Sequence, residues 1–427
     1  MSSDAAISPR EVRRSFALNV FNGAAFELAE KLIDPPLVLT WFVSQLTGSN
    51  LLIGLVATLA DAGWFLPQMF VSAPIQRMER KMPAYTLAAV IRTLAWIALA
   101  VGVWLVDDPT TLLVAFFVLY TTARMSGGLA GLSFFDVTAK TIPVQRRGSL
   151  FALRQFLGGV AGLSAGWVIR VVLGHPQLPF PHGHAVLFGL YCAIMIPALG
   201  AFIAIREPAG PARRERATLG TQFRRAGALL RADRVYRRYM ASRLVLGLTG
   251  IALPFYAIYA KNALGAPEWM VGVYVFTRVA AQLLANLPWG WLSDRYGNRR
   301  VMKYVHIGNS VTLLIALGLI ALVSGLQVEG SWLPYLALPL FLLNGAVTPA
   351  QVLVGSNFLL ELVPENDRPL YLGLSNTLMG SVVLVSALSG LLVDLFDFAG
   401  LFVVGLVLSV VGYALTRGLP EPREASS

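Results

Sequence analysis

Long apolar runs separated by short polar segments make up most of the chain. Six runs lie in the first half, at about residues 16–45, 51–72, 84–106, 110–135, 149–173 and 185–205. Six more follow, at about residues 239–261, 268–292, 304–325, 332–359, 370–395 and 398–417. A helix that crosses a bilayer needs about 20 mainly apolar residues. The pattern therefore predicts an all-α membrane protein with twelve transmembrane helices.

Composition excludes an ordinary soluble domain. Of the 427 residues, 56% are hydrophobic and 13% are charged, whereas a soluble domain has about 25% charged residues. The single cysteine, Cys192, excludes an intrachain disulfide framework and a cysteine-built metal site. His175, His182 and His184 share one loop without a cysteine or carboxylate beside them, so we expect no metal site and no cofactor.

The positive charge of the chain is a topology signal. The net charge is +11, and 27 of the 34 Lys and Arg residues fall on one side of the membrane when the N-terminus is placed in the cytoplasm. Cytoplasmic loops carry such an excess of basic residues. We therefore expect an integral protein of the plasma (bacterial inner) membrane with both termini cytoplasmic, no removable signal peptide and no nucleic-acid partner.

A basic segment divides the runs into two sets of six. Residues 206–243 contain 11 arginines and only three acidic residues. We expect an N-terminal six-helix bundle over 1–205, a cytoplasmic basic linker over 206–238 and a C-terminal six-helix bundle over 239–427. The linker is compatible either with an amphipathic helix on an anionic leaflet or with a solvated chain.

Two loops recur at corresponding places in the two halves. Residues 142–147 match 363–368 at an offset of 221, and residues 73–81 match 290–298 at an offset of 217. Parallel repeats of this kind are related by an axis along the membrane normal. The sequence thus predicts two six-helix halves with pseudo-two-fold symmetry.

The first apolar run contains four charged residues, Glu27, Glu30, Lys31 and Asp34. One ionised side chain at the bilayer centre costs at least about 2.5–3.5 kcal/mol, so this group predicts a water-filled cavity or mutual pairing. The i,i+3 and i,i+4 spacings favour one polar stripe. Alternatively, Lys31 neutralises a carboxylate and the stripe only positions helices, or part of the stripe is interfacial.

A helix break is expected directly after this stripe, because Pro35 and Pro36 remove backbone donors. Transporters place substrate and coupling-ion sites at such interrupted helices near the midplane. Each isolated arginine in the other runs is either a solute contact or a structural hydrogen-bond hub. The further intramembrane charged residues are Asp61, Arg92, Arg124, Arg154 and Arg278.

The loop after the eighth run carries a family resemblance. Its sequence, Gly-Trp-Leu-Ser-Asp-Arg-Tyr-Gly-Asn-Arg-Arg over 290–300, resembles the loop between the second and third helices of each half in the major facilitator superfamily. Together with the duplicated six-helix plan, the resemblance covers essentially the whole chain and implies that fold. It also implies a cytoplasmic gate in which an aspartate pairs with helix ends and arginines. The implied gate residues are Gly290, Asp294, Arg295, Gly297 and Arg299.

The first-half copy of this loop has Arg77 and Arg80 where the second half has Asp294 and Gly297, so the gate is expected to be asymmetric. Arg124, four residues before Gly128, resembles the fourth-helix arginine motif of proton-coupled members. The glycines at 158, 162 and 166 resemble the antiporter motif, with departures at 163 and 167 that weaken an efflux assignment.

The resemblance implies that the first, fourth, seventh and tenth helices line a central cavity. The predicted residues that bind substrate or protons are Glu27, Glu30, Lys31, Asp34, Asp61, Arg124 and Arg278. We expect Glu30 or Asp34 to bind a proton in alternation with the solute, because burial and neighbouring charges shift carboxyl pKa values.

The predicted function is secondary active transport of a small polar or charged organic solute by alternating access, coupled to protons, in a monomer within the bilayer. Efflux, including multidrug efflux, and uptake both remain open. The alternatives are an uncoupled facilitator and a non-transporting membrane assembly factor on the same fold. No phosphate-binding Walker loop, nucleophile elbow or HExxH helix occurs in the sequence, so no enzyme activity is expected.

Overall fold

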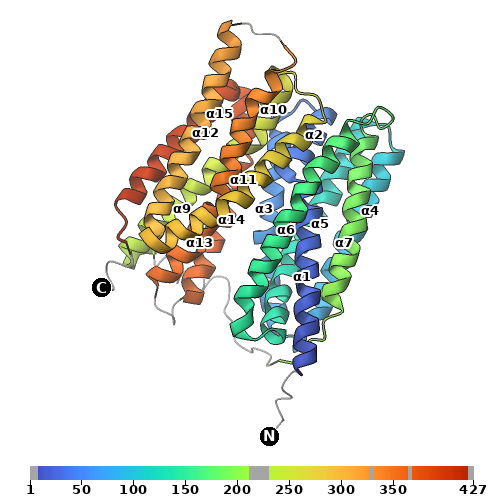
Figure 1. Ribbon diagram of the computed structural model, residues 1–427, viewed down its shortest axis with the longest axis vertical. Helices are drawn as coiled ribbons and strands as arrows, with labels where there is room; N and C mark the ends of the chain where they lie inside the picture. Colours follow the sequence, from blue (N-terminus) through green and yellow to red (C-terminus); the bar gives the residue numbers. More distant parts are fainter. Residues whose placement is uncertain (1–7, 211–229, 327–329, 364–367, 422–427) are drawn as a thin grey trace. The chain divides into compact units, whose positions relative to one another are not determined.

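Every regular element of the described residues is helical in the computed structural model, which describes residues 8–210, 230–326, 330–363 and 368–421 (Figure 1). Within these ranges, ten helices are long and apolar enough to cross a membrane. The prediction of an all-helical membrane protein is therefore confirmed. The central part of the predicted linker, and with it the amphipathic stretch, lies outside the described residues.

Two of the twelve predicted spans are not among these ten helices, for identifiable reasons. The first run is interrupted and charged, and its main helix is α1 (Pro9–Leu32). The eleventh run is divided between α14 (Arg368–Ser386) and the start of α15 (Ser389–Arg417). Inside α15, Asp397 has φ 57° and ψ −176°, which produces a kink. This kink lies where the sequence separates the last two spans.

The contacts divide the chain into two compact units. The first comprises Met1–Asp34 and Ala62–Arg216, and the second comprises Pro35–Asp61 and Ala217–Ser427. The division at 205 and 239 predicted above rests on the sequence repeat, and it remains a prediction.

The first unit is a bundle in which α1 packs against α6 and α7, while α4 packs against α5 and α7 (Figure 1). Its other helices are α3 (Asn50–Gln76, from Ala62 onward), α4 (Met82–Leu105), α5 (Pro109–Thr141), α6 (Val144–Leu173) and α7 (His182–Ile203). The buried ring of Trp96 is at the centre, with ring centroids of Tyr191 at 4.7 Å and Phe188 at 5.3 Å. Such aromatic packing adds to the area buried.

Side chains cap two of these helices at their N-termini. The hydroxyl of Ser8 accepts the backbone N–H of Glu11, and the carboxylate of Glu11 accepts the backbone N–H of Ser8, each at 3.3 Å. Asp108 precedes α5 and accepts the hydroxyl of Thr111 at 2.6 Å and its backbone N–H at 2.7 Å. These bonds satisfy orphan donors of the first turns, and they lower the pKa of Asp108.

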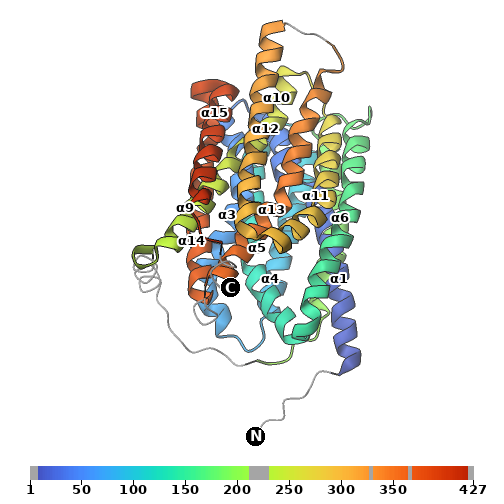
Figure 2. The same cartoon turned by 60° about the vertical axis from the view of Figure 1, so that its left-hand side comes forward.

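The second unit is built around α12, which packs against α13 and α15 (Figure 2). Its helices after the linker are α9 (Arg234–Thr249), η2 (Gly250–Ala252), α10 (Leu253–Ala263), α11 (Met270–Tyr296), α12 (Asn298–Leu326), η3 (Leu333–Ala337), α13 (Leu338–Leu362), α14 and α15. Ser242 of α9 bonds to Thr416 of α15 at 2.7 Å in the buried interior.

The predicted break in the first span is confirmed. α1 ends at Leu32, a π-helical turn η1 covers Pro35–Leu39, and α2 covers Thr40–Leu46. The prolines lack the N–H groups that would continue the α-helical bonds. After the break, the chain packs within the second unit, where Nζ of Lys261 donates to Oγ of Ser44 at 2.8 Å.

Candidate functional site

A carboxylate and two guanidinium groups meet inside the first unit. Arg124 of α5 donates a 2.7 Å hydrogen bond from Nη1 to Oε2 of Glu30 on α1. Nη1 of Arg92 on α4 lies 3.8 Å from Oε1 of the same carboxylate. The side chains of Glu30, Arg124 and Arg92 are 17%, 16% and 9% exposed. The charge of Glu30 is therefore paired, as the cost of an isolated ion in hydrocarbon requires.

Close backbone approach fixes the position of Arg124. A Cβ atom at Gly63 of α3 would lie 2.6 Å from the carbonyl carbon of Arg124, and a Cβ atom at Gly128 would lie 2.9 Å from the carbonyl oxygen of Gly63. Small residues allow helices to approach closely. The glycine four residues after Arg124 thus serves helix packing directly beside the ion pair.

Arg92 is not among the site residues that the sequence predicts. Its guanidinium carbon lies 5.1 Å from the ring centroid of Phe26, a cation–π distance. A Cβ atom at Gly127 would lie 3.2 Å from Nη2 of Arg92, so this glycine keeps space beside the guanidinium group. Tyr191, fully buried on α7, interacts electrostatically with Arg92, Glu30 and Arg124.

Arg154 of α6 is a structural hydrogen-bond hub. Its Nη1 donates to the carbonyl oxygen of Asn19 at 2.5 Å, to the side-chain oxygen of Asn19, and to Oδ1 of Asn22 at 3.1 Å. Its guanidinium group also lies over the ring of Phe134 at 4.7 Å. A Cβ atom at Gly23 would meet this guanidinium group at 2.6–2.7 Å. The hub therefore ties α1 to α6 without contacting Glu30.

The polar stripe predicted along α1 is divided between different neighbours. Glu30 faces α4 and α5, whereas Glu27 lies against α6, where a Cβ atom at Gly158 would be 2.7 Å from its Cβ. Lys31 is half-buried and forms no salt bridge with a described residue. Asp34 is 4% exposed and lies at the helix break.

The repeat offset of 217 places Asp61 and Arg278 at equivalent positions in the two halves, and both residues belong to the second unit. Asp61 is exposed on α3, and Arg278 is half-buried on α11. The backbone of Arg278 packs closely on α13, since a Cβ atom at Gly345 would lie 2.2 Å from its carbonyl oxygen.

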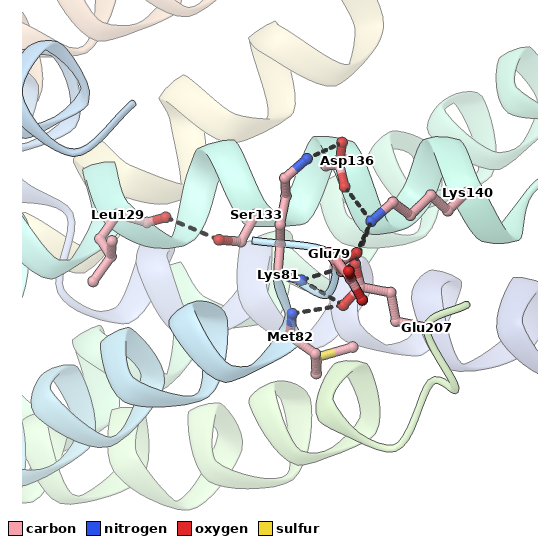
Figure 3. A network of polar contacts seen from close by, with 8 residues as sticks. All are labelled: Glu79, Lys81, Met82, Leu129, Ser133, Asp136, Lys140 and Glu207. Carbon is pink, nitrogen blue, oxygen red and sulfur yellow. Dashed lines mark hydrogen bonds and ion pairs between the residues drawn. The ribbon is translucent and has the colours of Figure 1, made fainter. Parts of the chain in front are cut away.

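A second polar network lies where α3 turns into α4 (Figure 3). The carboxylate of Glu207, 2% exposed, accepts the backbone N–H groups of Lys81 and Met82 at 2.7–2.9 Å. It also accepts Nζ of Lys140 at 2.7 Å. Asp136 pairs with Lys81 at 2.6 Å and with Lys140 at 2.9 Å. A carboxylate at a helix N-terminus complements the helix dipole.

The second-half loop has a related arrangement. α11 ends at Tyr296, and Gly297 follows with φ 81°, a conformation that favours glycine. The backbone N–H of Arg299 donates to Oε2 of Glu421 at 3.3 Å. The guanidinium carbon of Arg295 lies 5.6 Å from the ring centroid of Trp291. Asp294 is exposed on the last turns of α11.

Sequence reasoning missed Glu207 and Glu421, although a signal was available. Each follows the last helix of its half and is flanked by proline, in Arg-Glu-Pro at 206–208 and Pro-Glu-Pro at 420–422. Each also contacts the start of the third helix of its own half. The two segments therefore correspond to each other in the two halves, although they lie outside the repeated loops at 73–81 and 142–147.

Comparison with known proteins agrees with the fold. Residues 239–427 match the family model described as Major Facilitator Superfamily. The curated relative "Sugar efflux transporter A" of Dickeya chrysanthemi is 23% identical over 293 residues, which make up 65% of this chain and 69% of the relative.

Two solved structures share the fold over almost their full length. A D-xylose–proton symporter has a TM-score of 0.74 and 16% identity, with 96% of this chain and 98% of that chain covered. The nucleoside transporter NupG has a TM-score of 0.64 and 15% identity, with 96% and 98% covered. The second half of the chain is therefore similar in sequence to the major facilitator superfamily, and the whole chain shares the fold of these two transporters.

Proposed function

We propose that the protein carries a small polar or charged organic solute across the cytoplasmic membrane by alternating access, and that an inward or outward proton flux drives it. The observation that supports this most directly is the Glu30–Arg124 pair, which links α1 to α5 at 2.7 Å inside the first unit. Intramembrane ionisable groups are expensive and mark transport pathways and proton relays.

Glu30 is suited to couple proton binding to movement. Protonation would neutralise the Glu30 carboxylate, which pairs with both Arg124 and Arg92. It would thereby weaken the charge-assisted hydrogen bond between α1 and α5. A local change in charge can bias an element that has two arrangements. Asp34 is the second candidate, because it is buried at the start of the helix break.

The other selected residues complete the proposed machinery. Glu27, Lys31, Asp61 and Arg278 are proposed to border the solute path. The cytoplasmic gate is proposed to include Asp294, Arg295 and Arg299, with Gly290 and Gly297 shaping the loop. The two six-helix halves, 1–205 and 239–427, would be the moving bodies, in a monomer with both termini in the cytoplasm.

The names of similar proteins favour the same class of cargo. The curated relative is a sugar efflux transporter, and one solved structure of the same fold is a D-xylose–proton symporter. A sugar-sized polar solute and a proton as coupling ion are therefore consistent with the charged interior of the first unit.

The test is solute flux in proteoliposomes containing the purified full chain, with and without an imposed pH gradient. A panel of radiolabelled sugars, sugar acids and amino acids is used, with Glu30→Gln and Asp34→Asn as the variants. We expect one variant to keep counterflow of the solute but to lose accumulation driven by the pH gradient. The exposed Glu79→Gln serves as the matched control. Full retention of coupling in both variants would contradict the proton assignment, and absence of counterflow for every solute would contradict the carrier.

A further inference from the structure

Several buried polar atoms of the first unit have no hydrogen-bond partner among the described residues, and three of them belong to residues around the Glu30 carboxylate. These three are Nε of Arg92, Oε1 of Glu30 and the hydroxyl oxygen of Tyr191. Buried polar groups are nearly always bonded, and an exception calls for a physical explanation. These three come from α4, α1 and α7, and Tyr191 interacts electrostatically with both charged residues. A ligand that contacts this cluster would supply the missing hydrogen bonds.

The charge around these atoms is positive. In the spanning part of the first unit, Arg92, Arg124, Arg154 and Lys31 stand against Glu27, Glu30 and Asp34, which leaves an excess of one cation. Arg124 is committed to Glu30 and Arg154 to the asparagines of α1. Arg92 forms a 3.8 Å ion pair with Glu30 and a cation–π contact with Phe26, and its Nε has no hydrogen-bond partner among the described residues.

We propose that this cluster binds the carboxylate of the transported solute, and that the solute is a hydroxylated organic acid. The proposal rests on the proposed carrier function and names its substrate class. Nε–H of Arg92 and a second N–H of its planar fork donate to the two carboxylate oxygens, a geometry that guanidinium groups favour. The hydroxyl of Tyr191 donates as a third group. Oε1 of Glu30 accepts a hydrogen bond from a hydroxyl of the solute.

Both parts of the ligand are required by this arrangement. A neutral sugar would offer Nε of Arg92 no charged acceptor, and an acid without hydroxyl groups would leave Oε1 of Glu30 without a hydrogen-bond donor. A site built to bond a polar group discriminates strongly against an analogue that lacks the group, because the buried protein atom then stays unsatisfied. The solute is therefore expected to be recognised by the combination and not by either group alone.

The test measures ligand-induced stabilisation of the purified full chain and counterflow in proteoliposomes. The probes are glycerate, gluconate and glucuronate, with glucose as the neutral analogue of glucuronate and cyclohexanecarboxylate as the ring acid without hydroxyl groups. A ligand that binds only the folded state raises the melting temperature. We expect at least one hydroxylated acid to raise it, and the two analogues to bind at least tenfold more weakly.

Variants then assign the effect to Arg92. Arg92→Gln is expected to abolish the shift, whereas Arg92→Lys, which keeps the charge and loses the fork, is expected to weaken binding about tenfold. Arg170→Gln, exposed in the last turn of α6, is the matched control and should bind as the native protein does. A melting temperature equal to that of the native protein, measured without ligand, shows that each variant is folded.

The outcomes separate this inference from the carrier function. Counterflow of glucose without binding of any hydroxylated acid would overturn the inference and leave the carrier intact. Binding of a hydroxylated acid that depends on Arg92, without counterflow, would overturn the carrier and leave the binding site. No shift with any of the three acids, or an unchanged shift in Arg92→Gln, would overturn the inference.

Discussion

Glu30 of α1 and Arg124 of α5 form a 2.7 Å ion pair across 94 residues of sequence. The pair joins two helices that are far apart in the chain, and Arg92 of a third helix approaches the free side of the carboxylate. The charge of one residue therefore affects three helices at once. A change of the Glu30 side chain is therefore expected to alter the contacts among all three helices.

Removing one partner of this pair should lower the stability of the protein more than removing both partners. Arg124→Gln leaves the carboxylate of Glu30 with only the distant guanidinium group of Arg92. Loss of one partner from a buried pair costs about 3–5 kcal/mol, whereas replacing the pair can be nearly neutral. We expect the double variant Glu30→Gln, Arg124→Gln to be more stable than Arg124→Gln in thermal unfolding. Additive losses from the two single changes would contradict a coupled pair.

Arg206→Gln is the matched control for this comparison. Arg206 lies 3.9 Å from Glu11, and both side chains are largely exposed. Exposed ion pairs contribute about 0–1 kcal/mol. The control should therefore leave the melting temperature nearly unchanged.

Glu207 should be the most sensitive carboxylate outside the membrane interior. It accepts the backbone N–H groups of Lys81 and Met82 at the start of α4, and the ammonium group of Lys140. Glu207→Gln removes the charge and leaves Lys140 with a single carboxylate partner, Asp136, so we expect a loss on the order of 3 kcal/mol in the free energy of unfolding. Glu79→Gln is the control, because Glu79 contributes only its backbone carbonyl to this network. Equal stability of the two variants would show that the cap is dispensable.

Local patterns in the sequence predicted the helices and the break at Pro35, but not the partners of the charged residues. Apolar runs and prolines act through neighbouring backbone atoms, so their effects can be read along the chain. The contact of Glu30 with Arg92, by contrast, depends on how three helices rotate and pack. Helix packing also divides the predicted polar stripe. Glu27 and Glu30 are three residues apart, but Glu27 lies against α6 and Glu30 against α5.

A glycine in contact with Arg124 should be intolerant of a methyl group. A Cβ atom at Gly63 would lie 2.6–2.8 Å from backbone and Cβ atoms of Arg124, which cannot move without shifting α5. Overpacking typically costs about 1–3 kcal/mol, and the shift would displace Arg124 from Glu30. We expect Gly63→Ala to lower both the melting temperature and solute counterflow.

Gly102→Ala provides the control, because nothing lies within 4 Å of a Cβ atom at Gly102 in α4. Alanine is favoured over glycine in a helix by about 1 kcal/mol, so this variant should be as stable as the native protein or more so. A loss of stability in Gly102→Ala equal to that in Gly63→Ala would refute the packing argument.

Acid should weaken the N-terminal cap of α5. The hydroxyl and backbone N–H of Thr111 lower the pKa of Asp108 below the ordinary value of 3.8. A carboxyl pKa that is lower in the folded state contributes stability above the unfolded pKa, and this contribution is lost as the pH falls through the folded pKa. Hydrogen exchange at Thr111, corrected for its intrinsic rate, should therefore lose protection in strong acid. In Asp108→Asn the cap remains and does not titrate, so protection should be independent of pH over this range; a parallel loss in both proteins would rule out Asp108 as the cause.

The contact between Lys261 and Ser44 should control access to the segment after the helix break. Nζ of Lys261 donates to Oγ of Ser44 at 2.8 Å and to its carbonyl oxygen at 3.1 Å, and it lies 5.6 Å from the ring centroid of Trp41. If the helices separate during transport, this contact must open. Thiol labelling can follow the opening, because the single native cysteine, Cys192, is buried.

We expect Ser44→Cys to react slowly with a membrane-impermeant maleimide, and to react several-fold faster when Lys261→Ala is added. The backbone acceptor of residue 44 is retained in Ser44→Cys, so the ammonium group still has one of its two bonds. Gly48→Cys is the control, since Gly48 is exposed and its Cβ position is open; its labelling should be fast with or without Lys261. Equal labelling rates of Ser44→Cys with Lys261 and with Lys261→Ala would show that Lys261 does not hold this segment. The position of the segment would then be due to packing by Trp41.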